Sequence, residues 1–364
     1  MNTHSRWSVE KANEWYARQP WLIGCNFIPS NAINQLEMWQ ADTFDPATIE
    51  SELGWAAGIG FNTVRTFLHD LAWEADPQGF KHRVNHFLDI ASQYGIRPIL
   101  VIFDDCWNPN PSIGSQPMPK PGIHNSGWVQ SPGLDVVNQG SSAWSRLERY
   151  VRDVIGSFAN DERILFWDLY NEPGNSGNRE NSLPLVKSVF EWARATDPSQ
   201  PLSVGVWFDN KDLNEFQLAA SDIITFHNYS PADHLDRQIS ELNTHVRPVV
   251  CTEWMARTCG SLVNTHLPVF AEKKVGCINW GLVAGKTNTI YQWQDLNPLK
   301  GSIDSHVGPE IWFHDLFCAD GTPYDKSEIE IFQKYTGVRR ISPTSVISEL
   351  ARTDENAFRD SIIQ

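Results

Sequence analysis

Two glutamates, Glu172 and Glu253, stand in short motifs at the ends of apolar, strand-like runs. Glu172 lies in Asn-Glu-Pro after the run 164–170, and Glu253 lies in Thr-Glu-Trp at the end of the run 247–254. Two carboxyl groups can act together on one bond, because one protonates the leaving oxygen while the other attacks the carbon to which that oxygen is bonded. Glycosidic bond cleavage needs such a pair, and a separation of about 5–5.5 Å gives retention of configuration. Either glutamate alone could equally be an ion-pair partner at the rim of a sheet.

Eight short apolar runs alternate along the chain with amphipathic helical stretches. The runs are 21–28, 62–68, 97–103, 164–170, 201–207, 223–229, 247–254 and 276–283. The helical stretches are 8–17, 46–58, 80–94, 142–158, 183–195, 212–219, 233–244, 262–273 and 327–335. This alternation is typical of parallel β/α units. It predicts an α/β fold with a single (β/α)8 TIM barrel over residues 1–337, with the helix at 8–17 beneath it. The polar segment 338–364 is predicted to be a C-terminal surface extension.

Two connections are too long to be simple turns, and neither shows the regular pattern of a helix or a strand. They are 104–140 after the third run and 284–326 after the eighth. Both follow strands, so they lie at the C-terminal face, where barrel enzymes keep their active sites. The prolines of 104–140 stiffen that segment without regular structure. We expect this loop to wall part of the cleft and to favour short or terminal substrates.

Composition narrows the class of partner. The 364 residues carry a formal net charge of −15, which argues against nucleic acid or an anionic membrane surface and favours neutral substrates. The 16 tryptophans suit either core packing or stacking on flat ligands such as sugar rings. No run approaches a membrane span, and the polar N-terminus lacks a signal core. The chain as it stands is therefore expected in the cytoplasm, or outside it if an export signal has been removed.

The six cysteines show no metal-binding spacing. Three of them, Cys25, Cys251 and Cys277, lie inside apolar runs and are predicted to be buried free thiols. A disulfide framework is not expected at this chain length.

Several motifs together resemble a known group of enzymes. WDLYNEP (167–173) and VVCTEW (249–254) resemble the acid/base and nucleophile motifs of clan A glycoside hydrolases, and most closely those of family 5, the cellulase/mannanase family. Arg65, the His227-x-Tyr229 pair and Trp280 match further motif positions in the expected order. The resemblance implies a retaining β-glycosidase that hydrolyses O-glycosyl bonds, with Glu172 as acid/base and Glu253 as nucleophile. It implies a carbohydrate substrate and no metal or other cofactor.

The resemblance also assigns roles around the nucleophile. Tyr229 is expected to donate a hydrogen bond to Glu253, and Arg65 to lower the pKa of that carboxyl through its charge. Arg65 could instead be a structural charge that pairs carboxylates at the barrel end.

Further roles concern the acid and the sugar. Asn171 is expected to hydrogen-bond the sugar 2-hydroxyl, and Trp280 to offer a flat face to the ring. Glu172 should have a raised pKa so that it stays protonated. His227 would contact the sugar or tune Glu172. Core packing is the alternative for both His227 and Trp280.

One position departs from the family pattern. Many members carry a histidine at the end of strand 3, where this chain has Asp104 and Asp105. Either aspartate could bind sugar hydroxyls, or it could cap the loop or pair with Arg65. In the long loop that follows, His124 could replace the missing imidazole, and Trp107 could form a side wall.

Two other classes of function compete with this interpretation. A metal-dependent barrel hydrolase would use a cluster such as Asp104, Asp105, His69 and His227, although no paired His/Asp spacing supports one. A catalytically inactive, sugar-binding barrel is the second rival, and the presence of both glutamates speaks against it.

Overall fold

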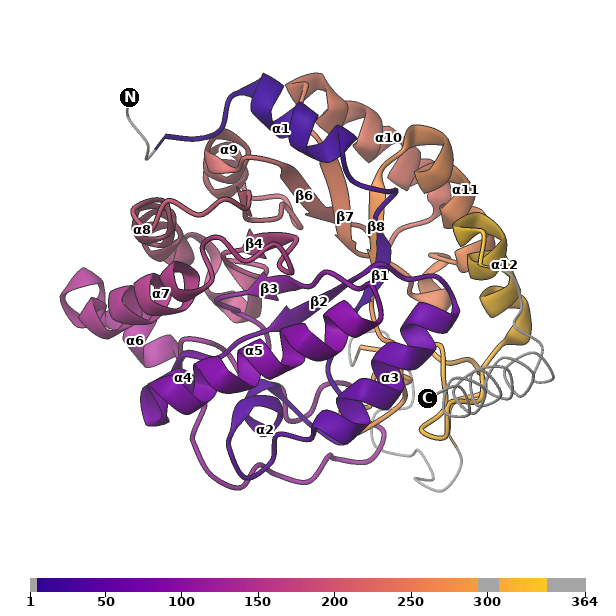
Figure 1. The fold of residues 1–364 in the computed structure, drawn as a ribbon, viewed down its shortest axis with the longest axis horizontal. Helices are drawn as coiled ribbons and strands as arrows, with labels where there is room; N and C mark the ends of the chain where they lie inside the picture. The colour runs from indigo at the N-terminus through magenta and orange to yellow at the C-terminus, as the bar shows by residue number, and fades with distance from the viewer. Residues whose placement is uncertain (1–4, 294–307, 339–364) are drawn as a thin grey trace, which may run out of the picture.

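A computed structural model describes residues 5–293 and 308–338. Eight parallel strands form a central barrel, with helices around its outside (Figure 1). The strands are β1 (Ile23–Asn26), β2 (Thr63–Phe67), β3 (Ile99–Val101), β4 (Phe166–Asp168), β5 (Leu202–Ser203), β6 (Ile224–His227), β7 (Val249–Glu253) and β8 (Gly276–Asn279). The predicted (β/α)8 barrel is confirmed.

The sheet runs in the order β5-β4-β3-β2-β1-β8-β7-β6. Between its two end strands, a parallel bridge joins Val206 to Phe226, and the Asp222 amide donates to the Leu202 carbonyl at 2.8 Å. The circle therefore closes, and the carboxyl ends of all eight strands meet at one face.

The helices of the outer layer match the predicted stretches to within three residues at each end. They are α3 (Pro46–Gly58), α5 (Pro77–Gln93), α7 (Ser145–Ser157), α8 (Leu183–Arg194), α9 (Lys211–Ala220), α10 (Ala232–Leu242), α11 (Val263–Lys273) and α12 (Lys326–Thr336). Three short helices were not predicted, namely α2 (Gln35–Trp39), α4 (Asp70–Ala75) and α6 (Leu134–Gln139). None of the helices among the described residues is long and apolar enough to cross a membrane.

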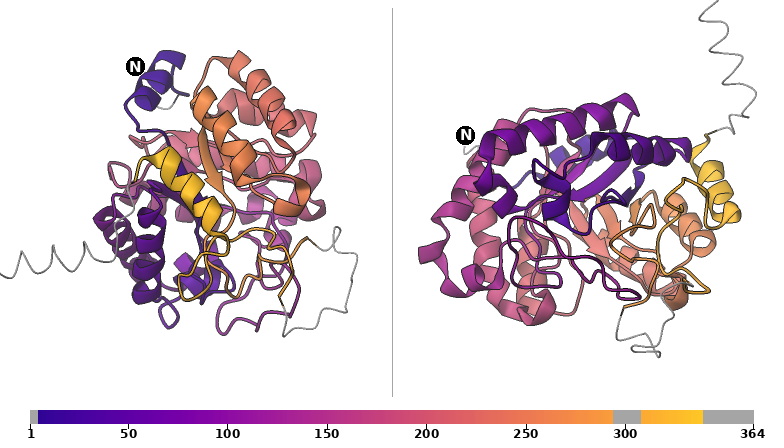
Figure 2. Two further views of the ribbon diagram at one scale, coloured as in Figure 1. Left: turned by 90° about the vertical axis from the view of Figure 1, so that its right-hand side faces the viewer. Right: turned by 90° about the horizontal axis from the view of Figure 1, so that it is seen from below.

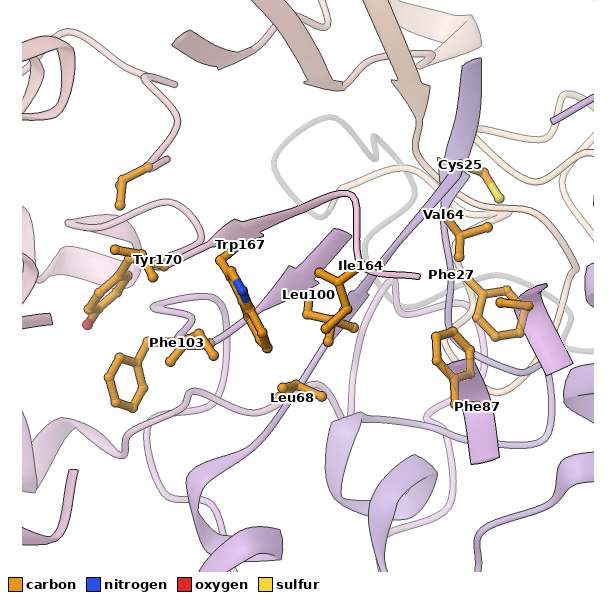
Figure 3. Close-up of a cluster of buried hydrophobic side chains, with 14 of the residues drawn as sticks. Cys25, Phe27, Val64, Leu68, Phe87, Leu100, Phe103, Ile164, Trp167 and Tyr170 are labelled. Atoms are coloured by element: carbon orange, nitrogen blue, oxygen red, sulfur yellow. The ribbon is translucent and has the colours of Figure 1, made fainter. Parts of the chain in front are cut away.

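The main core lies between the strands and the surrounding helices. Figure 3 shows part of it, where Leu100 of β3 and Trp167 of β4 are paired neighbours. Phe87 of α5 stacks on Phe27 with ring centroids 6.0 Å apart. Trp167 is fully buried, so its place in the core agrees with the expectation from its mid-strand position.

Helix α1 (Val9–Ala17) covers the amino-terminal end of the barrel, as predicted for the helix at 8–17. Its Trp15 packs in a cluster with the barrel residues Phe166, Val250 and Ile278. The Trp7 amide donates to Asp222 at 2.8 Å. This end is closed by apolar packing, which leaves the opposite face for chemistry.

The loop 104–140 and the described parts of 284–326 lie together at the carboxyl face (Figure 2). The described part of the segment 284–326 includes two tryptophans, Trp293 and Trp312. Trp293 lines a cavity at this face, whereas Trp312 stacks on Tyr324. The predicted surface extension at 338–364 falls almost wholly outside the described residues. All six cysteines are free thiols, and Cys25, Cys251 and Cys277 are buried as predicted.

Candidate active site

Glu172 and Glu253 both line a cavity of about 1250 Å³ at the carboxyl face of the barrel. Glu253 is the last residue of β7, so the strand itself directs its side chain into the mouth. Glu172 follows β4 with a backbone φ of 43°, in the left-handed region that a residue with a side chain rarely adopts. Strain of this kind is typical of functional sites, where the surrounding structure holds it in place.

The two carboxyl groups lie close together on either side of His227. Nδ1 of His227 is 2.8 Å from Oε1 of Glu172 and 3.4 Å from Oε2 of Glu253. One ligand atom from each of these three side chains lies within 4.8 Å of the others. Inverting glycosidases keep their carboxyl groups about 6.5–9.5 Å apart to leave room for a water molecule. The nearest ligand atoms of this pair approach each other more closely than that.

Glu253 receives a charged donor and a neutral one. Nη1 of Arg65 lies 2.8 Å from its Oε1, and the Tyr229 hydroxyl donates to its Oε2 at 2.9 Å. Arg65 is fully buried and also pairs with Asp168 at 2.8 Å. Arg65 is therefore in contact with the nucleophile candidate, as expected, and the alternative pairing with a barrel-end carboxylate is present as well.

Burial raises the pKa of Glu253 to about 7, and the neighbouring carboxyl of Glu172 contributes in the same direction. The Arg65 charge and the Tyr229 hydrogen bond lower the pKa. Arg65 thus acts in the expected sense, but burial outweighs it. The expectation of a lowered pKa for this carboxyl was wrong in its net sign.

Glu172 is surrounded by neutral groups. Its Oε1 faces His227, and its Oε2 accepts from the Cys106 thiol at 3.3 Å and from the Asn175 amide. Burial raises the pKa of Glu172, as expected, while the Cys106 and Asn175 hydrogen bonds oppose the rise. Two like charges this close repel each other, so the pair retains one proton more readily than two separate carboxyls would. The Arg65 guanidinium contacts Glu253 directly and opposes the rise of its pKa.

His227 is held neutral at the centre of the pair. Burial lowers its pKa to about 4. A neutral imidazole can donate or accept at Nδ1, so it can follow Glu172 between its protonated and ionised states. Of its two expected roles, the structure shows the contact with Glu172.

Asn171 lines the cavity between Arg65 and Asp104. Its Oδ1 accepts from Nη2 of Arg65 at 2.6 Å, and its Nδ2 donates to Oδ1 of Asp104 at 2.9 Å. These two bonds fix the orientation of the amide, so that Nδ2 also faces Cys106 at 3.4 Å. Asn171 is therefore oriented before any ligand binds.

The two aspartates after β3 do not line the cavity. Asp104 accepts from Trp128 at 2.7 Å and from Gln35 at 3.2 Å through its second oxygen, and its first also accepts from the Cys106 amide. All of its lone pairs are used by the protein, so it orients Asn171 and has no free oxygen for a sugar hydroxyl.

Asp105 is likewise committed to the fold. It accepts from the Tyr170 hydroxyl at 2.7 Å, from the Gly174 amide at 2.8 Å and from the Ser182 hydroxyl. These bonds fasten the segment that follows Glu172. The loop-capping alternative describes this residue better than sugar binding does.

The aromatic candidates are on the cavity wall. Trp107, His124 and Trp280 all line it, so the long loop folds back over the mouth as expected. His124 is 2 % exposed, and its Nδ1 lies 2.8 Å from the carbonyl of Tyr291. Burial lowers the pKa of His124 to about 4, so its ring is neutral. Trp280 meets Trp128 edge-on, with ring centroids 6.0 Å apart.

Among the described residues, the candidate metal-binding group is Glu172, His227 and Glu253. The cluster considered from the sequence is not formed. Asp104 and Asp105 are committed as above, and Nε2 of His69 lies 3.1 Å from the Gln130 carbonyl. The structure therefore does not bring the ligands of the metal-dependent rival together.

The model of the cellulase family, glycosyl hydrolase family 5, matches residues 29–296. The chain belongs to glycoside hydrolase family 5. It is therefore a glycosidase. No curated protein matches the chain significantly.

Solved structures with the family 5 barrel agree in fold. GH5_18 from Streptomyces cattleya in complex with GlcNAc is 13% identical, with a TM-score of 0.61 over 88% of this chain and 81% of that chain. An exo-beta-1,4-mannosidase from Opitutaceae bacterium strain TAV5 is 19% identical, with a TM-score of 0.59 over 89% and 61%. The endo-1,4-beta-mannanase from Rhizomucor miehei is 12% identical, with a TM-score of 0.55 over 86% and 97%. At these identities the likeness concerns the fold.

The cavity of this family 5 barrel also contains residues that were not selected from the sequence. Cys106 and Asn175 contact Glu172, and Trp207 and Trp293 line the wall. Cys106 directly follows Asp104 and Asp105, and this position after a strand end was the available signal. Trp207 is the last residue of the apolar run 201–207, and Asn175 lies three residues after Glu172, but neither stands in a motif that the resemblance covers.

Proposed function

We propose that this protein is a retaining β-glycoside hydrolase that cleaves a neutral oligo- or polysaccharide by double displacement. Glu172 is the acid/base, Glu253 is the nucleophile, and the catalytic unit is the barrel of residues 1–337. The observation that carries the proposal is the pair of carboxyl groups, which approach within 4.8 Å at the ends of β4 and β7. A charged guanidinium contacts Glu253, whereas a neutral thiol contacts Glu172, and this difference supports the two separate roles.

In the first step, Glu172 gives its proton to the glycosidic oxygen while a carboxylate oxygen of Glu253 attacks the anomeric carbon. The bond to the leaving group breaks, and a glycosyl ester forms on Glu253. In the second step, Glu172 takes a proton from water, which attacks the same carbon and releases Glu253. Arg65 and Tyr229 contact the carboxylate before and after the ester forms, so little rearrangement is needed.

The remaining contacts support the same assignment. The Nδ2 hydrogen of Asn171 that faces the weakly accepting sulfur of Cys106 can be shared with a ring hydroxyl, an interaction that strengthens in the transition state. His227 stays neutral and can exchange its hydrogen-bond role as Glu172 loses and regains its proton.

The test is the variant Glu253→Ala on an aryl β-glycoside with a good leaving group. We expect kcat to fall by about four orders of magnitude or more, because no covalent intermediate can form. Azide should partly restore turnover and give a glycosyl azide of inverted configuration. Glu241→Ala, which removes an exposed glutamate on α10, should keep wild-type activity. Near wild-type activity in the first variant would refute the nucleophile.

NMR of early products tests the double displacement itself. The wild-type enzyme should release a sugar that has kept the β configuration. A first product with the α configuration would overturn the two-step mechanism.

A further inference from the structure

Four rings follow one another in an arc along the cavity wall, from the segment after Glu172 to the nucleophile candidate. The ring centroids are 5.7 Å apart for Trp107 and His124, 6.4 Å for His124 and Trp293, and 5.0 Å for Trp293 and Tyr229. The first end of the arc is fixed because the Trp107 amide donates to the Ser176 hydroxyl at 2.9 Å, in the segment after Glu172. At the other end, the Tyr229 hydroxyl donates to the nucleophile candidate. The arc therefore starts beside the acid and ends beside the nucleophile.

The arc is rigid because the two long loops are tied to each other. The Asn125 amide donates to the Thr287 carbonyl at 2.8 Å. Nδ2 of Asn288 donates to the carbonyls of Lys120 at 2.9 Å and Ile123 at 3.3 Å. The imidazole of His124 contacts the Tyr291 carbonyl from within this junction. Asn125, Thr287 and Tyr291 are each less than a tenth exposed, so the junction is packed rather than merely adjacent.

The cavity also has lining residues outside the arc, next to the segment that carries Glu172. Trp207, which follows β5, lines the cavity there, and its Nε1 donates to the Pro173 carbonyl at 3.1 Å. Its ring packs on Phe208 with centroids 4.2 Å apart, so its position is fixed. An acid that protonates the leaving oxygen must lie between the two sugars being separated. The leaving group therefore extends past Glu172 toward Trp207, and the sugar that is attacked lies inside the arc.

We propose that the arc closes the cavity beyond one sugar residue, so that the enzyme removes single sugars from the non-reducing ends of short glycans. This inference rests on the proposed function and adds the substrate class. Trp207 is the stacking platform for the first sugar of the leaving group. A cavity of about 1250 Å³ exceeds the roughly 300–1,000 Å³ of common small-molecule sites, which leaves room for that part of the substrate.

The experiment uses oligosaccharides labelled at the reducing end, of the sugar that a panel of aryl β-glycosides identifies. The expected products are the monosaccharide and a ladder that shortens by one sugar at a time. The same oligosaccharide with its non-reducing terminal sugar chemically blocked by a bulky acetal should be cleaved at less than about one hundredth of the rate.

The outcomes separate the two proposals. Turnover of aryl glycosides together with early cleavage of internal bonds, or of the blocked substrate, would overturn the closed pocket and leave the hydrolase intact. Turnover of none of the glycosides would count against the proposed function itself.

Substitutions at the cavity wall test which side chains restrict cleavage to the terminal sugar. Trp293→Ala opens the arc and should raise the ratio of blocked to unblocked cleavage by about tenfold. Trp192→Ala, which removes a tryptophan from the outer helix α8, should leave this ratio unchanged. Trp207→Ala should lower kcat/KM for the disaccharide more than for the aryl glycoside of the same sugar, by roughly tenfold or more if it stacks one sugar. The assignment places the attacked sugar inside the arc and the leaving group against Trp207. It would be refuted if Trp293→Ala left the ratio of blocked to unblocked cleavage unchanged and Trp207→Ala left the disaccharide preference unchanged.

Discussion

Glu172 and Glu253 are chemically identical side chains that the structure surrounds differently. A guanidinium contacts Glu253, while Glu172 receives hydrogen bonds from a thiol and an amide and faces a neutral imidazole. Burial raises the pKa of both carboxyls. In the proposed mechanism, the direct contact with Arg65 favours the ionised form of Glu253, and Glu172 carries the remaining proton. The proposed division of roles rests on the neighbours of each carboxyl.

The role of Glu172 can be tested by varying the leaving group. Glu172→Ala should lower kcat/KM by about 10²–10⁴-fold on substrates with sugar leaving groups, because proton donation contributes that much. Activated aryl glycosides should lose far less in the first step, since the departing group is already a stable anion. Rates for a series of aryl leaving groups measure this dependence. Equal losses on both kinds of substrate would show that Glu172 acts through structure alone.

Cys106 tunes the acid in our interpretation. Its thiol donates to Oε2 of Glu172, and burial raises the pKa of the thiol well above its usual value, so the proton stays in place. A donor stabilises the ionised form of Glu172 and lowers its pKa. Cys106→Ala should therefore raise the pKa of Glu172 and move the basic limb of the kcat/KM profile upward by about 0.5–1 pH unit.

Two controls accompany this pH profile. Cys106→Ser keeps a donor, and its basic limb should lie closer to that of the wild type than the limb of the alanine variant. Cys318→Ala removes a free thiol that does not line the cavity and should not move the limb. A downward shift in Cys106→Ala would contradict the proposed hydrogen-bond donation.

The predictions for single residues failed where the hydrogen-bond partners are distant in the sequence. Glu172, Glu253, His227 and Tyr229 could be placed from strand-end motifs, because a strand's direction fixes where its last side chains point. The bonds that occupy Asp104 come from Gln35, Trp128 and Asn171. Two of these partners lie in irregular chain or in a short helix, so no local pattern indicates that the carboxylate is already satisfied.

At the level of elements, the spacing of the apolar residues predicted the long amphipathic helices. The stretch 46–58 coincides with α3, and 183–195 differs from α8 by one residue. The missed helices α2, α4 and α6 have five or six residues, less than two full turns, so they display no period to detect. One bond of the loop junction joins backbone groups of Asn125 and Thr287, which leave no trace in residue type.

One buried arginine holds α12 against the end of the loop that follows β8. The guanidinium of Arg257 pairs with Glu328 of α12 at 2.6 Å and donates to the carbonyls of Trp312, His314 and Asp315. Arg257→Ala leaves these acceptors and a largely buried carboxylate without their donor. Breaking a buried pair in this way costs about 3–5 kcal/mol, which urea unfolding should show as a lower free energy of unfolding.

The matched control for this change is Arg237→Ala. Arg237 forms an exposed ion pair with Asp233 one helical turn away on α10. Such pairs contribute only about 0.3–0.5 kcal/mol. Similar losses in the two variants would mean that Arg257 does not hold α12 and the loop together.

Across the whole molecule, stability and chemistry occupy opposite ends of the barrel. Trp7 and Trp15 close the amino-terminal end with apolar packing. At the carboxyl end the long loops and strand-end side chains surround the cavity. This division is the general plan of barrel enzymes. It explains why the fold was readable from alternating strands and helices, whereas the shape of the cavity required the loops.

The formal net charge of −15 acts on every approaching substrate. Among the described residues that line the cavity, Lys120 is the one lysine or arginine, while two glutamates lie at the centre. An anionic sugar therefore meets a negative molecule and a cleft with little compensating charge. At low salt, an aryl β-uronide should have a kcat/KM at least about tenfold below that of its uncharged methyl ester, which has the same ring configuration.

Salt provides the final check on this charge effect. Raising the ionic strength from about 0.01 M to 1 M shortens the screening length from roughly 30 Å to 3 Å. The uronide and its ester should then converge because the kcat/KM of the uronide rises, while that of the ester stays nearly constant. The measurement is kcat/KM for both compounds across this range, with whichever ring configuration the enzyme accepts. A uronide that is cleaved faster than its ester at low salt would mean that a cation in the cleft binds the carboxylate, and Lys120→Ala would then identify it.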